Sequence, residues 1–159
     1  MSENKLVYKV FYDTTPGFIS TGILLLRCII GIYLFVGGAG KALHWFGGYG
    51  MPATIEFFAK AGIPAPLAYL SCYTEFLGGF LLIVGLFTRP VAFAILINMT
   101  VATIVSLHGG LMGPTSAQTP LLFLIIDIAV LLTGPMAYSL DRLIFSKVKG
   151  IYTPGQLII

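Results

Sequence analysis

The chain has 159 residues, of which 57% are hydrophobic and only 9% are charged, and it carries a formal net charge of +3 at pH 7. Soluble domains are about half apolar and a quarter charged, so this composition, with a mean hydropathy of +0.96, excludes an ordinary soluble protein and indicates a membrane protein. The basic residues form no dense stripe, which argues against a nucleic-acid-binding surface. Nothing else of domain size fits this length, so we expect one membrane domain over residues 1–159.

The first apolar run follows a polar tail, MSENKLVYKVFYDTTPG, and covers residues 18–43. A signal peptide has an apolar core of about 7 to 15 residues, so this run is too long to be one. We therefore expect the tail to belong to the mature protein and the run to be a transmembrane helix.

Four apolar segments are long enough to cross a bilayer, whose hydrocarbon core of about 30 Å needs about 20 helical residues. They are residues 18–43, 66–87, 91–108 and 119–138. The fourth is apolar only as far as Thr133, and we expect Gly134 and Pro135 to kink or end it. The predicted fold is an all-α integral membrane four-helix bundle.

The connection between the first two segments is long and holds residues 52–61, a short helix that Pro52 can begin and Gly62 can end. We expect this helix to lie in the outer membrane interface. The amphipathic rings of Trp45 and Tyr49, in the same connection, suit the level of the lipid headgroups.

Basic residues near helix ends favour the cytoplasmic side of a membrane. One side of the predicted bundle carries six of them and the other side carries two. The six are Lys5, Lys9, Arg89, Arg142, Lys147 and Lys149, and the two are Lys41 and Lys60. We therefore expect both termini in the cytoplasm, with the protein in the cytoplasmic (inner) membrane of a prokaryote.

Small residues follow one face of the first helix and one face of the second. On the first helix, steps of four and three residues make one stripe of Arg27, Gly31, Leu34, Gly38 and Lys41. On the second helix the stripe consists of Ala68, Ser71, Cys72, Glu75, Gly79 and Leu82. Small residues let helix backbones approach closely, so we expect the two stripes to pack together and the glycines, Gly85 included, to be structural.

Each predicted helix carries one strongly polar residue at a similar depth. At 1.5 Å per residue from the cytoplasmic edge, the depths are about 15 Å for Arg27, 18 Å for Glu75, 12 Å for Asn98 and 10 Å for Asp127. An isolated charge at such a depth costs about 2.5 to 3.5 kcal/mol on insertion scales. We therefore expect the four to form one buried network in which Arg27 pairs with Glu75.

Two roles are open for this network. It could clamp the helices together and set their register. Alternatively, two acids facing one arginine leave one carboxyl group able to hold a proton, so Glu75 and Asp127 could relay protons while Arg27 and Asn98 contact a ligand.

The other reactive residues are sparse. Cys28 and Cys72 lie on different helices at different depths, so we expect neither a disulfide nor a dithiol redox centre. His44 and His108 are placed near the outer surface with Lys41 in reach, where they could hold a quinone headgroup; a structural role is the alternative. Two histidines without further ligands do not define a metal site, so no metal is predicted.

Four motifs, in this order, resemble the DoxX family of small four-helix membrane proteins over about residues 22–142. They are LLRCIIGIYLFVGGAGKAL, AGIPAP, TEFLGGFLLIVGLFTRPVA and GPMAYSLDR. The positions that match the family pattern are Arg27, Lys41, Glu75, Gly79, Gly85, Arg89 and Asp141. His44 and Asp127 are assigned from this sequence alone.

The resemblance implies a role as the membrane subunit of a quinone-linked or thiol- or sulfur-linked oxidoreductase system, as in the DoxD-type subunit of a thiosulfate:quinone oxidoreductase. Such a role implies a quinone headgroup held by Lys41 and His108, and a soluble or membrane redox partner subunit.

Two other classes of function stay open: a scaffold or chaperone for another membrane protein, and a carrier of a small hydrophobic or weakly acidic molecule with Arg27 as the anion contact. The chain could also form a homo-oligomer.

Overall fold

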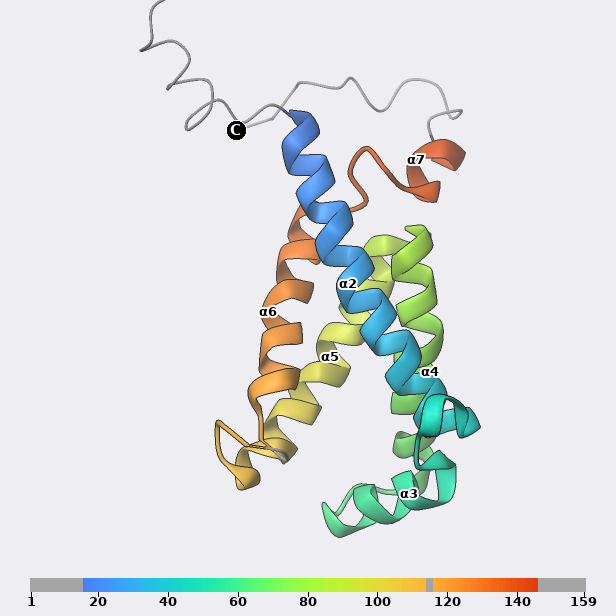
Figure 1. Ribbon diagram of the computed structural model, residues 1–159, viewed down its shortest axis with the longest axis vertical. Coiled ribbons are helices and arrows are strands. Elements are labelled where there is room, and N and C mark those ends of the chain that lie inside the picture. Colours follow the sequence, from blue (N-terminus) through green and yellow to red (C-terminus); the bar gives the residue numbers. More distant parts are fainter. Residues whose placement is uncertain (1–15, 114–115, 146–159) are drawn as a thin grey trace, which may run out of the picture.

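The computed structural model describes residues 16–113 and 116–145, and every regular element in these ranges is a helix (Figure 1). The elements are α2 (Pro16–Leu43), η1 (Trp45–Gly47), α3 (Gly50–Lys60), α4 (Ala65–Val84), α5 (Thr88–Ser106), η2 (Leu107–Gly109), α6 (Gln118–Thr133) and α7 (Leu140–Phe145). The predicted all-helical class is confirmed. The tail lysines that were used to orient the chain, Lys5, Lys9, Lys147 and Lys149, lie outside the described residues.

Three helices of the described chain are long and apolar enough to cross a membrane: α2, α4, and α5 together with the η2 turn. α6 is apolar but has only 16 residues, about 24 Å of helix against a hydrocarbon core of about 30 Å. It ends at Thr133, because Gly134 adopts a positive φ of 71° and Pro135 cannot continue the helix. The prediction of a helix or kink boundary at Gly134 is confirmed, whereas the predicted span over 119–138 is too long at its end.

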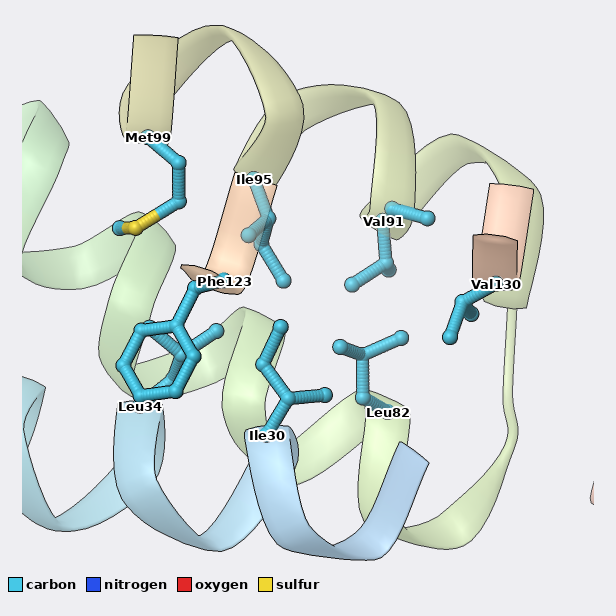
Figure 2. Close-up of a cluster of buried hydrophobic side chains, with 9 residues drawn as sticks. Ile30, Leu34, Leu82, Val91, Ile95, Met99, Phe123 and Val130 are labelled. Carbon is cyan, nitrogen blue, oxygen red and sulfur yellow. The ribbon is translucent and has the colours of Figure 1, made fainter. Parts of the chain in front are cut away.

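One apolar core is shared by α2, α4, α5 and α6. α2 packs most extensively on α4, and α5 packs on α6. The buried side chains that form the core are Ile30, Leu34, Leu82, Val91, Ala92, Ile95, Met99, Phe123 and Val130 (Figure 2). Many other large apolar side chains are exposed on the outside of the helices, where they are suited to contact with lipid chains.

Glycines bring the backbones of α2 and α4 into direct contact. A Cβ atom added at Gly79 would lie 2.5 Å from the Phe35 amide nitrogen, and one added at Gly31 would lie 2.9 Å from the Gly79 carbonyl oxygen. At Gly38 an added Cβ would collide with the backbone of Phe76. The prediction that the two small-residue stripes pack against each other is therefore confirmed.

The molecule has two different ends (Figure 1). One end, called here the α3 end, holds η1, α3 and the loop from η2 to α6; the short helix predicted over 52–61 is present there as α3. The other end, called the α7 end, holds the start of α2, the turn between α4 and α5, and α7. α2 has 28 residues and α4 has 20, so their lengths are about 42 Å and 30 Å, and α2 extends past α4 at the α7 end (Figure 1).

The turn between α4 and α5 is fastened from a distant part of the chain. Gly85 ends α4 in the left-handed conformation, with φ of 69°. The Asp141 carboxylate accepts hydrogen bonds from the backbone amides of Phe87 and Thr88, with N–O distances of 2.7 and 2.8 Å. These bonds cap the start of α5. The Asp141 amide donates in return to the Gly85 carbonyl oxygen at 3.0 Å.

Candidate functional site

A part-buried ion pair joins α2 to α4 on the side of the core that faces the α3 end. The Lys41 Nζ donates to both carboxylate oxygens of Glu75, at 2.9 and 2.7 Å. From α5, the Asn98 Nδ2 donates to Glu75 Oε1 at 3.3 Å. These three residues, called here the acid cluster, come from three helices, and two of them bind the carboxylate of the third.

The two charged members differ in their access to the surroundings. The Glu75 side chain is 6% exposed, whereas the Lys41 side chain is 37% exposed. A lysine ammonium has three donor hydrogens, and Glu75 accepts two of these bonds. Lys41 is therefore the charged member of the acid cluster that an incoming molecule can reach, and Glu75 is the charge behind it.

Aromatic rings lie beside the acid cluster. Phe76, the neighbour of Glu75 on α4, stacks on Phe35 with ring centroids 5.1 Å apart. It also meets Trp45 edge to face at 6.4 Å, one helical turn beyond Lys41. Trp45, placed by its sequence at the headgroup level, thus contacts the helix that carries Glu75.

Arg27 does not pair with Glu75, and that prediction is wrong. The Arg27 guanidinium donates to two carbonyl oxygens of the segment after α6, from Nη1 to Pro135 at 3.0 Å and from Nη2 to Tyr138. It also lies against Gly85, where an added Cβ would be 2.8 Å from Cζ. Arg27 is 1% exposed and belongs to the α7 end.

The error has a geometric cause. The predicted depth of Arg27 was counted from the first apolar residues of α2, but this helix extends past the end of α4 (Figure 1). Arg27 is therefore level with Gly85, at the end of α4, rather than with Glu75. Glu75 lies ten residues nearer the start of α4, which is about 15 Å of helix.

The other two members of the predicted polar layer have different surroundings. Asn98 contacts Glu75, as expected. Asp127 is 0% exposed on α6, and neither of its carboxylate oxygens has a hydrogen-bond partner among the described residues. It lies on the same face of α6 as the core residues Phe123 and Val130. Asp127 is thus a separate buried acid and not a fourth member of the acid cluster.

The two histidines belong to different parts of the α3 end. His44 precedes η1, which packs on α2. The His44 ring lies against Gly50, where an added Cβ would be 2.9 Å from His44 Nδ1. His108 lies in η2, which packs on α5, and its Nδ1 is 3.2 Å from the Val105 carbonyl oxygen. Within the described ranges no group of three or more His, Cys, Asp or Glu side chains could hold a metal ion.

The residues assigned to structure gather at the α7 end, apart from the glycines of the α2–α4 contact. Gly85 leaves room for the Arg27 guanidinium, and Gly134 leaves room for Arg89, whose Nε would be 2.9 Å from an added Cβ. Asp141 caps α5. Cys28 and Cys72 are both free thiols.

Sequence reasoning missed the partner of Glu75, although Lys41 lies on the same stripe of α2 as Arg27. The two helices run antiparallel, and Gly31 lies against Gly79 while Arg27 lies against Gly85. Positions near the end of α2 therefore face positions nearer the start of α4, which brings the long Lys41 side chain to Glu75 and leaves Arg27 out of reach.

Comparison with known sequences gives two family matches. The sequence model of the DoxX family matches residues 22–109, and that of the "TQO small subunit DoxD" family matches residues 66–159. A protein of Bacillus subtilis (strain 168) with the name "Putative oxidoreductase CatD" is 37% identical over 129 residues, which is 80% of this chain and 90% of that protein. No solved structure matches the chain significantly.

Proposed function

The chain belongs to the DoxX family, and from this premise we propose that it is an integral membrane subunit of an oxidoreductase system that binds a quinone headgroup at the acid cluster. Electrons would come from a redox partner subunit, because the described residues offer no group of three or more metal ligands and the two cysteines are free thiols on different helices. The matches to an oxidoreductase and to a TQO small subunit support the redox assignment.

The membrane arrangement belongs to the same proposal. α2, α4, α5 and α6 would cross the membrane as one four-helix domain, with both termini in the cytoplasm and the α3 end outside. The basic-residue count supports this orientation. The 16-residue α6 would span with the help of the residues that follow it, since a helix shorter than the hydrocarbon core is accommodated by local thinning or by its flanking residues.

One observation carries the redox proposal: a partly exposed lysine is backed by a buried carboxylate, and the residue after that carboxylate, Phe76, meets Trp45 edge to face. A bound quinone accepts two electrons and two protons. Lys41 Nζ can donate a hydrogen bond to a carbonyl oxygen, and the same nitrogen is 2.7 Å from Glu75 Oε2. Asn98 holds Glu75 in orientation, and the ring of Trp45 offers a flat apolar contact for a flat ligand.

Asp127 would serve as a second place to hold a proton. A carboxylate with no hydrogen-bond partner and no exposure is costly in its charged form, so burial favours the neutral acid. Glu75 and Asp127 are two buried carboxyl groups at different places in the core. A proton relay through the described helices would use these two carboxyl groups.

The test is retention of quinone by the purified protein. The full chain is extracted in mild detergent, and bound small molecules are identified by mass spectrometry. We expect a quinone in the parent and a loss of at least about tenfold in Lys41→Met, the change expected when about 1.4 kcal/mol of binding free energy is removed. The matched control is Lys60→Met, because Lys60 pairs with Glu56 at 2.8 Å on the exposed α3 helix and should not affect retention.

Two outcomes would overturn the redox proposal. One is absence of quinone from the parent together with a protein bound at equal stoichiometry, which would favour the scaffold class. The other is equal retention in the Lys41→Met and Lys60→Met variants, which would move the headgroup away from the acid cluster.

The proton role of Asp127 has its own test. Hydrophobic carbodiimides react with protonated carboxyl groups, so labelling followed by peptide mass spectrometry should modify Asp127 at pH 7. The exposed Glu56 is the control, because the hydrogen bond from Lys60 holds the pKa of its carboxyl group below the usual value. Labelling of Glu56 without Asp127 would show that Asp127 holds no proton.

A further inference from the structure

A groove opens on the outside of the α7 end, far along the helices from the acid cluster. It lies between α2, the end of α4, and the segment that leads into α7, and its lining includes Leu24, Arg27, Ile83, Tyr138, Ser139 and Leu140. Most of its surface is apolar. Arg27 is 1% exposed and yet lines the groove, so its side chain lies at the base.

Arg27 is a buried cation with no carboxylate among its hydrogen-bond partners, and Asp141 interacts with it through charge alone. Its two bonds go to neutral carbonyl oxygens, those of Pro135 and Tyr138. Its Nε is buried and has no hydrogen-bond partner within residues 16–113 and 116–145. No ion pair involving Arg27 occurs in the same part of the chain, where the ion pairs are Lys41–Glu75 and Lys60–Glu56. A guanidinium has five donor hydrogens, so this one keeps both unused hydrogen-bond capacity and its charge.

The rest of the α7 end adds positive charge. Arg89 lies beside Gly134, and Arg142 is exposed on α7. The acid found at this end, Asp141, is already bound to the amides of Phe87 and Thr88. The described residues therefore leave this end of the molecule with an excess of cations, which attracts anions at a membrane surface.

The position of the groove along the helices indicates which kind of anion it can bind. Arg27 lies against Gly85, the residue that ends α4, so the groove is at the height where a membrane helix ends and lipid headgroups begin. A ligand there meets apolar walls along the helices and a guanidinium at the base. A neutral amphiphile would fill the walls but leave the charge of Arg27 unmatched, whereas free phosphate would match the charge but not the walls.

We propose that this groove binds the phosphate group of an anionic phospholipid, with Arg27 as the buried donor and the acyl chains along the apolar walls between α2 and the end of α4. Arginine suits this task because phosphate oxygens accept several of its hydrogen bonds at once. The site is distinct from the acid cluster, and it stands whether or not that cluster binds a quinone.

The experiment compares three probes on the full-length protein in mild detergent: phosphatidylglycerol, phosphatidylcholine and inorganic phosphate. Thermal unfolding reports stabilisation by each, and native mass spectrometry reports retained lipid. We expect one retained anionic lipid per chain, and a rise in the melting temperature with phosphatidylglycerol at a concentration about tenfold lower than with phosphatidylcholine. Inorganic phosphate at the same concentration should give no shift.

Variants locate the site without disturbing the bonds of Arg27. Leu24→Trp should fill the groove and abolish both the retained lipid and the preference for phosphatidylglycerol. Its matched control is Leu70→Trp, which places the same ring in the apolar groove between α4 and α5 and should change neither. Equal stabilisation by the two lipids, full reproduction of the shift by inorganic phosphate, or an unchanged preference in Leu24→Trp would each overturn the proposal. The first two measurements need only the parent protein, so they decide even if a variant fails to fold.

Discussion

The α3 end and the α7 end balance their charges in different ways. At the α3 end, Lys41 and Lys60 each have a carboxylate partner, Glu75 at 2.7 Å and Glu56 at 2.8 Å. At the α7 end, Arg27 is held by backbone carbonyl oxygens instead. A buried cation in a membrane helix therefore does not by itself predict a direct ion pair with a carboxylate.

Helix ends explain why carbonyl oxygens can replace an acid. The last carbonyl groups of a helix and those that follow it have no partner within the helix and carry partial negative charge. α6 ends at Thr133, and the chain after it turns back over the α7 end, which presents the carbonyl oxygens of Pro135 and Tyr138 to Arg27. At the α3 end the lysine lies across from the middle of α4, where the backbone is already paired, so a side chain has to supply the charge.

The largest effect is expected from separating the members of the Lys41–Glu75 pair. Lys41→Met strands the buried carboxylate, and loss of one partner of a buried pair costs about 3 to 5 kcal/mol. The double variant Lys41→Met/Glu75→Leu should recover much of that loss, because no charge is then left buried. Denaturation in detergent micelles measures both. Additive losses in the double variant would mean that the pair is not an energetic unit.

The next largest effect is expected at the α7 end, from Gly85→Ala. Gly85 has a φ of 69°, and an added Cβ would lie 2.8 Å from the Arg27 guanidinium. The left-handed conformation costs an alanine about 1 to 2 kcal/mol, and displacement of Arg27 from its carbonyl partners adds to this. Gly22→Ala is the control, because nothing lies within 4 Å of a Cβ there. Equal melting temperatures for the two variants would contradict the packing of Arg27 on Gly85.

A smaller effect is expected from Asp141→Asn. The carboxylate accepts two amide hydrogen bonds at the start of α5, whereas the neutral amide has one acceptor oxygen. Removal of a helix cap costs about 0.5 to 2 kcal/mol, and the retained oxygen should keep the loss in the lower part of that range. The amides of Phe87 and Thr88 should exchange hydrogen faster in the variant, whereas the exchange rates of amides at the α3 end should not change.

No measurable effect on stability is expected from Glu56→Gln. Lys60 lowers the pKa of Glu56, so any stabilisation from this pair is present above the ordinary glutamate pKa and is lost as the pH falls through the lowered value. The carboxyl group is fully exposed, and solvent screens the interaction. Melting temperatures of parent and variant should coincide at pH 7 and at pH 3. A difference at pH 7 alone would show that this exposed pair does contribute to stability, against the expectation.

The sequence predicted what depends on hydropathy and on residue spacing. The helices, the small-residue stripes and the end of α6 at Gly134 all follow from local patterns. The pairing of Arg27 failed because depth was counted separately on helices of unequal length, whereas the register between them is set by the contact of Gly31 with Gly79. The cap on α5 could not be derived at all, since Asp141 is 53 positions from Thr88 and is brought there only by the complete fold.

That cap also sets an order on assembly. The amides of Phe87 and Thr88 begin α5, but the carboxylate that satisfies them belongs to a residue made only after α6 has been synthesised. Arg27 likewise has no hydrogen-bond acceptors until Pro135 and Tyr138 have been synthesised. A nascent chain that has produced α2, α4 and α5 therefore carries a buried cation and an uncapped helix start, and both are satisfied in a single late step. A chain shortened before Pro135 would stay in that incomplete condition, with neither the carbonyl partners of Arg27 nor the cap on α5.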